Sequence, residues 1–178
     1  MRLIEPIARF DLAFSLFCIQ HRFNQQVATV SKAVSHTGDG HLYALFGIAA
    51  WLVDPDDGFA FLVTGLLAFL VELPLYLLLK NLFQRRRPPE FCASITAFIT
   101  PSDRFSLPSG HTTAAFLMAS LVAFYYPTLG PLAFIWAGCI GASRILLGVH
   151  FFTDVLIGVG LGISCAQFAV KSFSEWMI

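Results

Sequence analysis

Long apolar segments separated by short polar turns fill most of the chain from residue 42 onward. The chain is 57% hydrophobic and 12% charged, whereas soluble domains usually carry about twice that charge. A membrane-spanning helix needs about 20 mainly apolar residues. The pattern therefore predicts an all-α, polytopic membrane helix bundle with about five spans, or six as the alternative. The expected spans lie within residues 42–53, 59–79, 112–126, 132–142 and 150–169.

The first 37 residues do not follow this pattern. The apolar run at residues 12–19 is too short to cross a bilayer and lacks the flanks of a signal peptide. Residues 23–34 are polar, with apolar positions at helical spacing. We expect one or two amphipathic helices in the membrane interface, with a broken spanning helix as the alternative. The chain then divides into an N-terminal interfacial segment, 1–37, and a membrane bundle, 38–178.

Three polar clusters fall on one face of the membrane when the spans are counted. They lie at residues 80–87, 109–111 and 144–154, and the turns at 54–58 and 127–131 fall on the other face. Most Lys and Arg residues share the face of the clusters, which the positive-inside rule would place in the cytoplasm. Arginines that bind a substrate bias that count, so charge alone does not fix the orientation.

The second cluster marks the start of a helix. Pro108 ends regular structure before it, and Ser109 is a favoured N-cap residue. Ser109 and Gly110 thus lie at a helix start, and the free N–H groups of a helix start bind anions. His111 in the same turn is able to give or take a proton near neutral pH.

The first cluster is basic. Lys80 and Arg87 are seven positions apart, so on a helix ended by Pro88 both would project from one side. Arg85 and Arg86 are expected to point elsewhere. Taken alone, the cluster also fits a basic edge at the lipid headgroups.

The third cluster pairs a histidine with a carboxylate. His150 and Asp154 are four positions apart, a spacing at which the carboxylate reaches an imidazole nitrogen and strengthens the other as a base or nucleophile. The guanidinium of Arg144 is suited to gripping phosphate oxygens. A simple interfacial His–Asp hydrogen bond is the alternative.

Together the clusters describe an anion site for phosphate, with an acid and a nucleophile. We expect no further carboxylate beside it, so that cations rather than Mg²⁺ neutralise the phosphate charge. His36, Asp39 and His41 fit a helix cap with interfacial imidazoles better than a metal site, so no metal is predicted. Glu72, inside a span, is expected to pair with another bundle residue or to be protonated. The net charge of zero gives no indication of nucleic-acid binding.

The three clusters resemble the motifs of the type-2 phosphatidic acid phosphatase superfamily, which comprises membrane lipid-phosphate phosphatases related to vanadium haloperoxidases. The family pattern is a lysine, six residues and Arg-Pro; then Pro-Ser-Gly-His; then Ser-Arg, five residues, a histidine, three residues and an aspartate. The chain carries these parts, intact and in order, as Lys80 with Arg87-Pro88, as Pro108-Ser109-Gly110-His111, and as Ser143-Arg144 with His150 and Asp154.

The resemblance implies a mechanism. His150 would attack phosphorus and form a phosphohistidine, Asp154 would orient it, and His111 would protonate the leaving oxygen. It also implies that no metal or cofactor is needed and that, as in bacterial members, the site faces the periplasm from the inner membrane. The residues expected to hold the phosphoryl oxygens are Lys80, Arg87, Ser109, Gly110 and Arg144.

The predicted function is hydrolysis of a membrane lipid phosphate. Undecaprenyl diphosphate, phosphatidylglycerophosphate and phosphatidic acid are the substrates considered, with the lipid tail admitted by an apolar lateral opening between spans. A phosphotransferase acting between a lipid diphosphate and a second lipid such as lipid A is the alternative enzyme. A non-catalytic lipid-binding or transport bundle is the third hypothesis. The sequence gives no prediction of oligomeric state.

Overall fold

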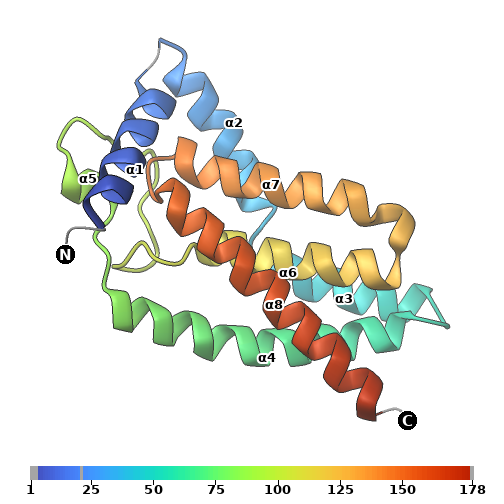
Figure 1. The fold of residues 1–178 in the computed structure, drawn as a ribbon. Helices are drawn as coiled ribbons and strands as arrows, with labels where there is room; N and C mark the ends of the chain where they lie inside the picture. The colour runs from blue at the N-terminus through green and yellow to red at the C-terminus, as the bar shows by residue number, and fades with distance from the viewer. Residues whose placement is uncertain (1–3, 21, 177–178) are drawn as a thin grey trace.

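The computed structural model describes residues 4–20 and 22–176, and within these residues all regular structure is helical. This confirms the predicted all-α class. The helices in chain order are α1 (Ile4–Ile19), α2 (Asn24–His36), α3 (Gly40–Val53), α4 (Gly58–Phe83), α5 (Pro88–Phe91), α6 (Gly110–Tyr125), the 3-10 turn η1 (Pro127–Leu129), α7 (Gly130–Leu146) and α8 (Phe152–Trp176) (Figure 1).

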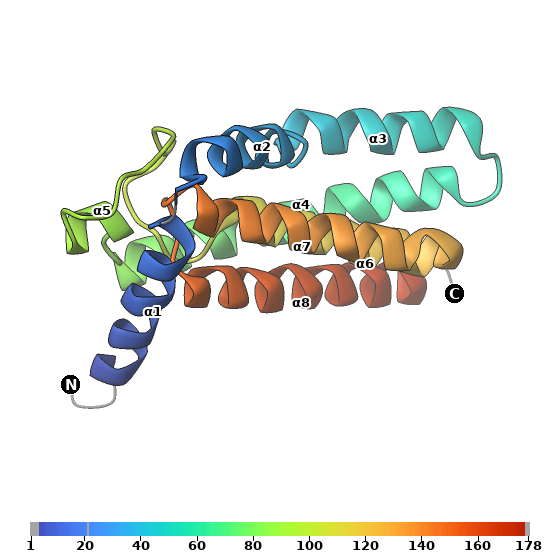
Figure 2. The ribbon, with the colours of Figure 1, turned by 90° about the horizontal axis from the view of Figure 1, so that it is seen from above.

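Five helices, α3, α4, α6, α7 and α8, run roughly side by side and form the bundle (Figures 1 and 2). Helix α6 packs against both α7 and α8. Glycines bring α6 and α8 together: a Cβ atom at Gly162 would lie 2.3 Å from the carbonyl oxygen of Thr113. Small residues at such contacts are typical of membrane helix packing.

The bundle has the surface of a membrane protein. Among the described residues, three helical stretches, which begin at Gly58, Pro127 and Phe152, are long and apolar enough to cross a bilayer. Helices α3 and α6 are apolar but shorter. Leucines on the outer side of α4, including Leu70 and Leu78, are exposed, as expected where lipid rather than water is the neighbour.

The polar clusters gather at one end of the bundle. The ends of α4 and α7 and the starts of α6 and α8 meet there, together with α1, α2, α5 and the loop over residues 92–109 (Figures 1 and 2). The turns at residues 54–57 and 126–130 lie at the other end. The segment before residue 37 thus forms two helices, and both lie at the polar end.

The predicted helix from Lys80 to Arg87 is wrong. Helix α4 ends at Phe83, and Gln84 adopts a left-handed conformation with φ of 44°. The N–H of Gln84 donates to the carbonyl of Lys80, a common way to end a helix. Pro88 does not end α4; it begins α5, where a missing N–H does no harm. Arg87 therefore lies in the turn between two helices.

Candidate active site

His150 lies in the connector between α7 and α8 and is almost fully buried. Its Nδ1 is 2.7 Å from the carbonyl oxygen of Ser106. A carbonyl only accepts, so Nδ1 carries the proton and Nε2 keeps its lone pair. Burial lowers the pKa of His150 to about 4, so the ring is neutral at neutral pH.

The predicted hydrogen bond between His150 and Asp154 is not formed. Asp154 Oδ2 lies 3.8 Å from His150 Nδ1, which is too long for a hydrogen bond. The same oxygen accepts instead from the backbone N–H of Phe151 at 2.8 Å. The Ser106 carbonyl has taken the position expected of the carboxylate, and Asp154 acts on the ring by its charge.

Arg85, expected to point away from the site, reaches into it. Its Nη1 donates to Asp154 Oδ1 at 2.7 Å, and its Nη2 donates to Asp11 Oδ2 at 2.6 Å. Asp11, fully buried on α1, also accepts from the backbone N–H of Thr153. The left-handed turn at Gln84 redirects the chain and makes this possible. The only indication of this contact in the sequence was Asp11, a carboxylate directly before the apolar run at residues 12–19.

Lys80 and Arg87 are brought together by a carboxylate rather than by a shared helix face. Asp103 Oδ2 lies 2.5 Å from Lys80 Nζ, and Asp103 Oδ1 lies 2.6 Å from Arg87 Nη2. Arg87 Nη1 also donates to the carbonyl of Val149 at 2.6 Å. Burial alone would raise the pKa of Asp103, but hydrogen bonds and charge from Lys80 outweigh it, and the pKa is lowered.

The expectation of no further carboxylate beside the cluster is therefore wrong. Asp103 and Asp39 both lie in it. The loop at residues 92–109 carries no periodic pattern from which the position of Asp103 could be predicted.

The start of α6 has the predicted position at the polar end. The N–H of Ser109 donates to the backbone carbonyl of Asp154 at 3.1 Å, and its hydroxyl lies 2.8 Å from Thr112 Oγ1. A Cβ at Gly110 would lie 3.0 Å from the ring of Tyr76, so a larger residue would have to push this ring aside. The helix start is thereby packed against both α8 and α4.

His111 is held by Asp39, for which the sequence favours a helix cap over a metal ligand. His111 Nε2 lies 3.0 Å from Asp39 Oδ1, and Asp39 Oδ2 lies 2.6 Å from His36 Nδ1. The Asp39 side chain makes no cap hydrogen bond. Burial would raise its pKa, but hydrogen bonds from the two imidazoles lower it. Asp39, His36 and His41 also have ligand atoms within 4.8 Å of one another, but they are largely exposed.

Arg144 completes the cluster from the end of α7. Its Nη1 donates to the hydroxyl of Ser35 at 2.6 Å, and its backbone carbonyl accepts from the N–H of His150. Its buried Nε has no hydrogen-bond partner among the described residues. Arg144 and His111 line a shared opening of about 220 Å³.

Residues 58–178 match the family model described as the PAP2 superfamily. The chain belongs to the PAP2 superfamily. It is therefore an integral, multi-pass membrane protein and a lipid phosphate phosphatase.

Two relatives are similar in sequence over much of the chain. The decaprenylphosphoryl-5-phosphoribose phosphatase of Mycobacterium tuberculosis is 32% identical over 133 residues, which cover 74% of this chain and 72% of the relative. The phosphatidylglycerophosphatase B of Bacillus subtilis is 37% identical over 121 residues, which cover 62% of this chain and 56% of the relative.

Two solved structures share the fold. The PAP2-type phosphatidylglycerolphosphate phosphatase of Bacillus subtilis superposes with a TM-score of 0.74 at 27% identity, over 97% of this chain and 88% of that one. LpxE of Aquifex aeolicus superposes with a TM-score of 0.77 at 24% identity, over 90% and 94%, which supports the fold alone.

Proposed function

We propose that this PAP2 protein hydrolyses a lipid phosphate monoester or diphosphate through a phosphohistidine on His150. The observation that carries the proposal is the hydrogen bond from His150 Nδ1 to the Ser106 carbonyl, which leaves Nε2 with a free lone pair. A neutral, oriented imidazole is a competent nucleophile toward phosphorus. Asp154 stabilises the positive charge that the ring gains in the reaction, and Arg85 holds Asp154 in place.

The reaction has two steps. Nε2 of His150 attacks phosphorus, the bond from phosphorus to the lipid oxygen breaks, and His111 gives that oxygen a proton. Because Nε2 of His111 faces Asp39, Nδ1 is the nitrogen that supplies this proton. Water then attacks the phosphohistidine and gives a proton back to His111, which releases inorganic phosphate and restores both rings.

Charge stabilisation in this mechanism comes from the protein. Phosphoryl transfer depends mainly on positioning and on neutralising the oxygens of the transferring group. We assign this to side-chain cations, to the Ser109 hydroxyl and to the free N–H groups at the start of α6, of which Gly110 supplies one. No metal is needed in this scheme. The side chains that bind the phosphoryl oxygens are Lys80, Arg87 and Arg144.

The lipid would enter from the side. An apolar cavity of about 440 Å³ runs from His111 along the space between α3, α4 and α6, and it is the counterpart of the lateral opening expected from the sequence. We propose five spans, formed by α3, α4, α6, α7 and α8, with α1 and α2 in the interface. The site would face the periplasm of a bacterial inner membrane. Polyprenyl and glycerolipid phosphates are both candidate substrates, in line with the names of the relatives.

A lipid phosphotransferase is the second candidate, because the site has two openings. The cavity of about 440 Å³ and the polar opening of about 220 Å³ both include Asp39 and His111 in their walls. The polar opening would admit water in the phosphatase and an acceptor headgroup in the phosphotransferase.

The test is phosphate release by the purified protein from a panel of lipid phosphates, with and without a lipid acceptor. Hydrolysis predicts free phosphate without an acceptor, and none from His150→Ala. His41→Ala is the matched control, because His41 is an exposed histidine at the same end of the bundle with no role in the mechanism. Phosphate appearing only on the acceptor would favour the transferase, and an active His150→Ala variant would refute the assignment of the nucleophile.

A further inference from the structure

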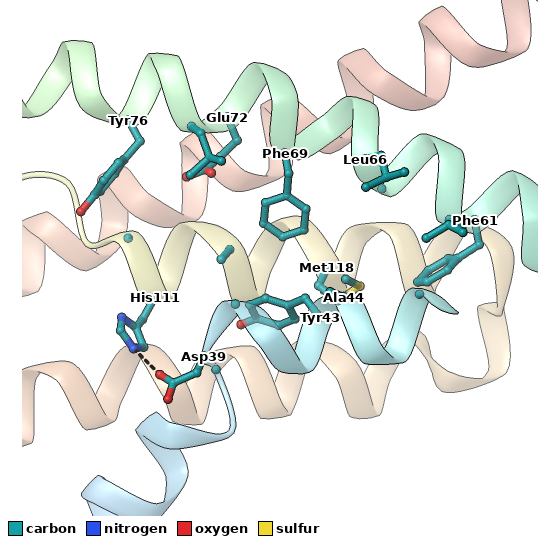
Figure 3. A pocket seen from close by; sticks show the side chains of 18 residues that line it. Asp39, Tyr43, Ala44, Phe61, Leu66, Phe69, Glu72, Tyr76, His111 and Met118 are labelled. Atoms are coloured by element: carbon teal, nitrogen blue, oxygen red, sulfur yellow. Dashed lines mark hydrogen bonds and ion pairs between the residues drawn. The ribbon is translucent and has the colours of Figure 1, made fainter. Parts of the chain in front are cut away.

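The cavity beside the site is apolar over most of its length. It runs between α3, α4 and α6, and its walls include Phe61, Phe69 and Met118 (Figure 3). At the end nearest the site lie Tyr76 and His111. A lipid whose phosphate is bound at Lys80 and whose leaving oxygen faces His111 would extend into this cavity.

Glu72 breaks the apolar character of the wall. It is one turn from Tyr76 and two turns from Lys80 on α4, and it lines the cavity with only 3% of its surface exposed. No hydrogen bond or ion pair joins it to another residue in the part of the chain that the structure describes, contrary to the pairing considered from the sequence. An ionisable side chain at membrane depth is costly and usually serves a function.

Tyr43 lies on the α3 side of the same cavity (Figure 3). Its hydroxyl is buried and has no hydrogen-bond partner among the described residues. A buried polar group without a partner is costly. The Tyr43 hydroxyl is such a group, and the Glu72 carboxyl group lines the same cavity without a protein partner among the described residues, so a bound molecule is the available partner for both.

The depth of these groups restricts the chemistry of that molecule. With a rise of about 1.5 Å per residue, Glu72 lies about 12 Å from Lys80 and about 6 Å from Tyr76 along α4. A glycerophospholipid carries ester carbonyls or a hydroxyl just beyond its phosphate, within reach of this depth. A polyprenyl phosphate carries only hydrocarbon there and would leave both groups unpaired. The site would therefore discriminate against this lipid.

We propose that Glu72 and Tyr43 form a polar subsite that binds the glycerol-ester region of a glycerolipid phosphate, and that the enzyme therefore prefers such lipids to polyprenyl phosphates. The Tyr43 hydroxyl donates to an ester carbonyl. Glu72 accepts from a lipid hydroxyl or, when protonated, donates to the second carbonyl. The subsite rests on the proposed function, because it selects the substrate of the same phosphatase.

The experiment compares phosphatidic acid with a polyprenyl monophosphate in the same detergent micelles, so that the reacting group is identical. We expect the wild-type ratio of kcat/KM to favour phosphatidic acid. Its glycerol region offers only carbonyl acceptors, so Glu72 donates to it in the protonated form, and Glu72→Leu should lower the ratio by about fivefold, as for a lost hydrogen bond between neutral groups. Glu72→Gln, which keeps hydrogen-bonding capacity, and Tyr43→Phe should lower it less. Glu175→Leu, the same change at an exposed position on α8, should leave the ratio unchanged.

The outcomes separate the subsite from the phosphatase itself. An unchanged ratio in Glu72→Leu, a wild-type preference for the polyprenyl lipid, or an equal shift in Glu175→Leu would overturn the subsite. If Glu72→Leu does not fold, the same criteria apply to Glu72→Gln and Tyr43→Phe. A wild-type protein that releases phosphate from neither lipid would overturn the proposed function as well.

Discussion

Replacing Asp39 by Asn tests whether His111 acts as the acid. The Asn side chain keeps the shape and the hydrogen-bonding oxygen but removes the charge that stabilises a protonated His111. The side chains of His111 and Asp39 are 29% and 32% exposed, so solvent weakens their interaction. A hydrogen bond to a charged group contributes about 1.5–3 kcal/mol. We take the lower value, about 1.5 kcal/mol, which corresponds to about a tenfold loss in kcat/KM.

The loss should depend on the leaving group. A lipid alkoxide needs a proton from His111, whereas p-nitrophenolate leaves readily without one. We therefore expect Asp39→Asn to lose about tenfold in kcat/KM on the lipid phosphate and less than about threefold on p-nitrophenyl phosphate. Asp56→Asn, the same change in the turn at the other end of the bundle, is the control. An equal loss on both substrates would refute the reasoning, because it would indicate a general disturbance of the site.

Three further predictions concern the support and charge of the site. Arg85→Met leaves the buried carboxylates of Asp11 and Asp154 without the cation that they share and should destabilise the protein by about 3 kcal/mol in thermal unfolding, whereas Arg86→Met, at an exposed neighbour, should not. Burial lowers the pKa of His150 to about 4. The single-turnover rate of phosphoenzyme formation should therefore not fall near pH 6.5 through protonation of the nucleophile. Because the unfolded ring binds its proton at about pH 6.5, the free energy of unfolding should fall as pH drops from about 6.5 toward 4, by about 1.4 kcal/mol per unit. Turnover should be complete in the presence of a metal chelator, and strict Mg²⁺ dependence would contradict the proposed mechanism.

The sequence predicted the fold through its simplest regularities. Apolar segment length and composition were enough to predict a helical membrane bundle, and counting spans placed residues 80–87, 109–111 and 144–154 at one end. The glycines of α8 were also interpretable, because Gly158 and Gly162 lie where α6 approaches closely.

The contacts that support the site were not predictable in the same way. Arg85 reaches Asp154 only because Gln84 adopts a left-handed turn, which ordinary helix periodicity does not foresee. Asp39 and Asp103 lie in turns and loops, where no repeat relates sequence position to direction. The spacing of His150 and Asp154 predicted a hydrogen bond that the Ser106 carbonyl makes instead. Local spacing indicated the groups that we propose to react, but partners distant in the chain orient them.

Chemical trapping of the phosphoenzyme tests the central proposal most directly. The purified protein would be mixed with lipid phosphate labelled in the phosphoryl group, quenched in alkali within one turnover, and digested for mass spectrometry. We predict a phosphate on the imidazole of His150, at Nε2, that disappears during turnover and is absent from His150→Ala. Label on another residue, or phosphate released by an active enzyme with no labelled histidine at any time, would contradict the proposal.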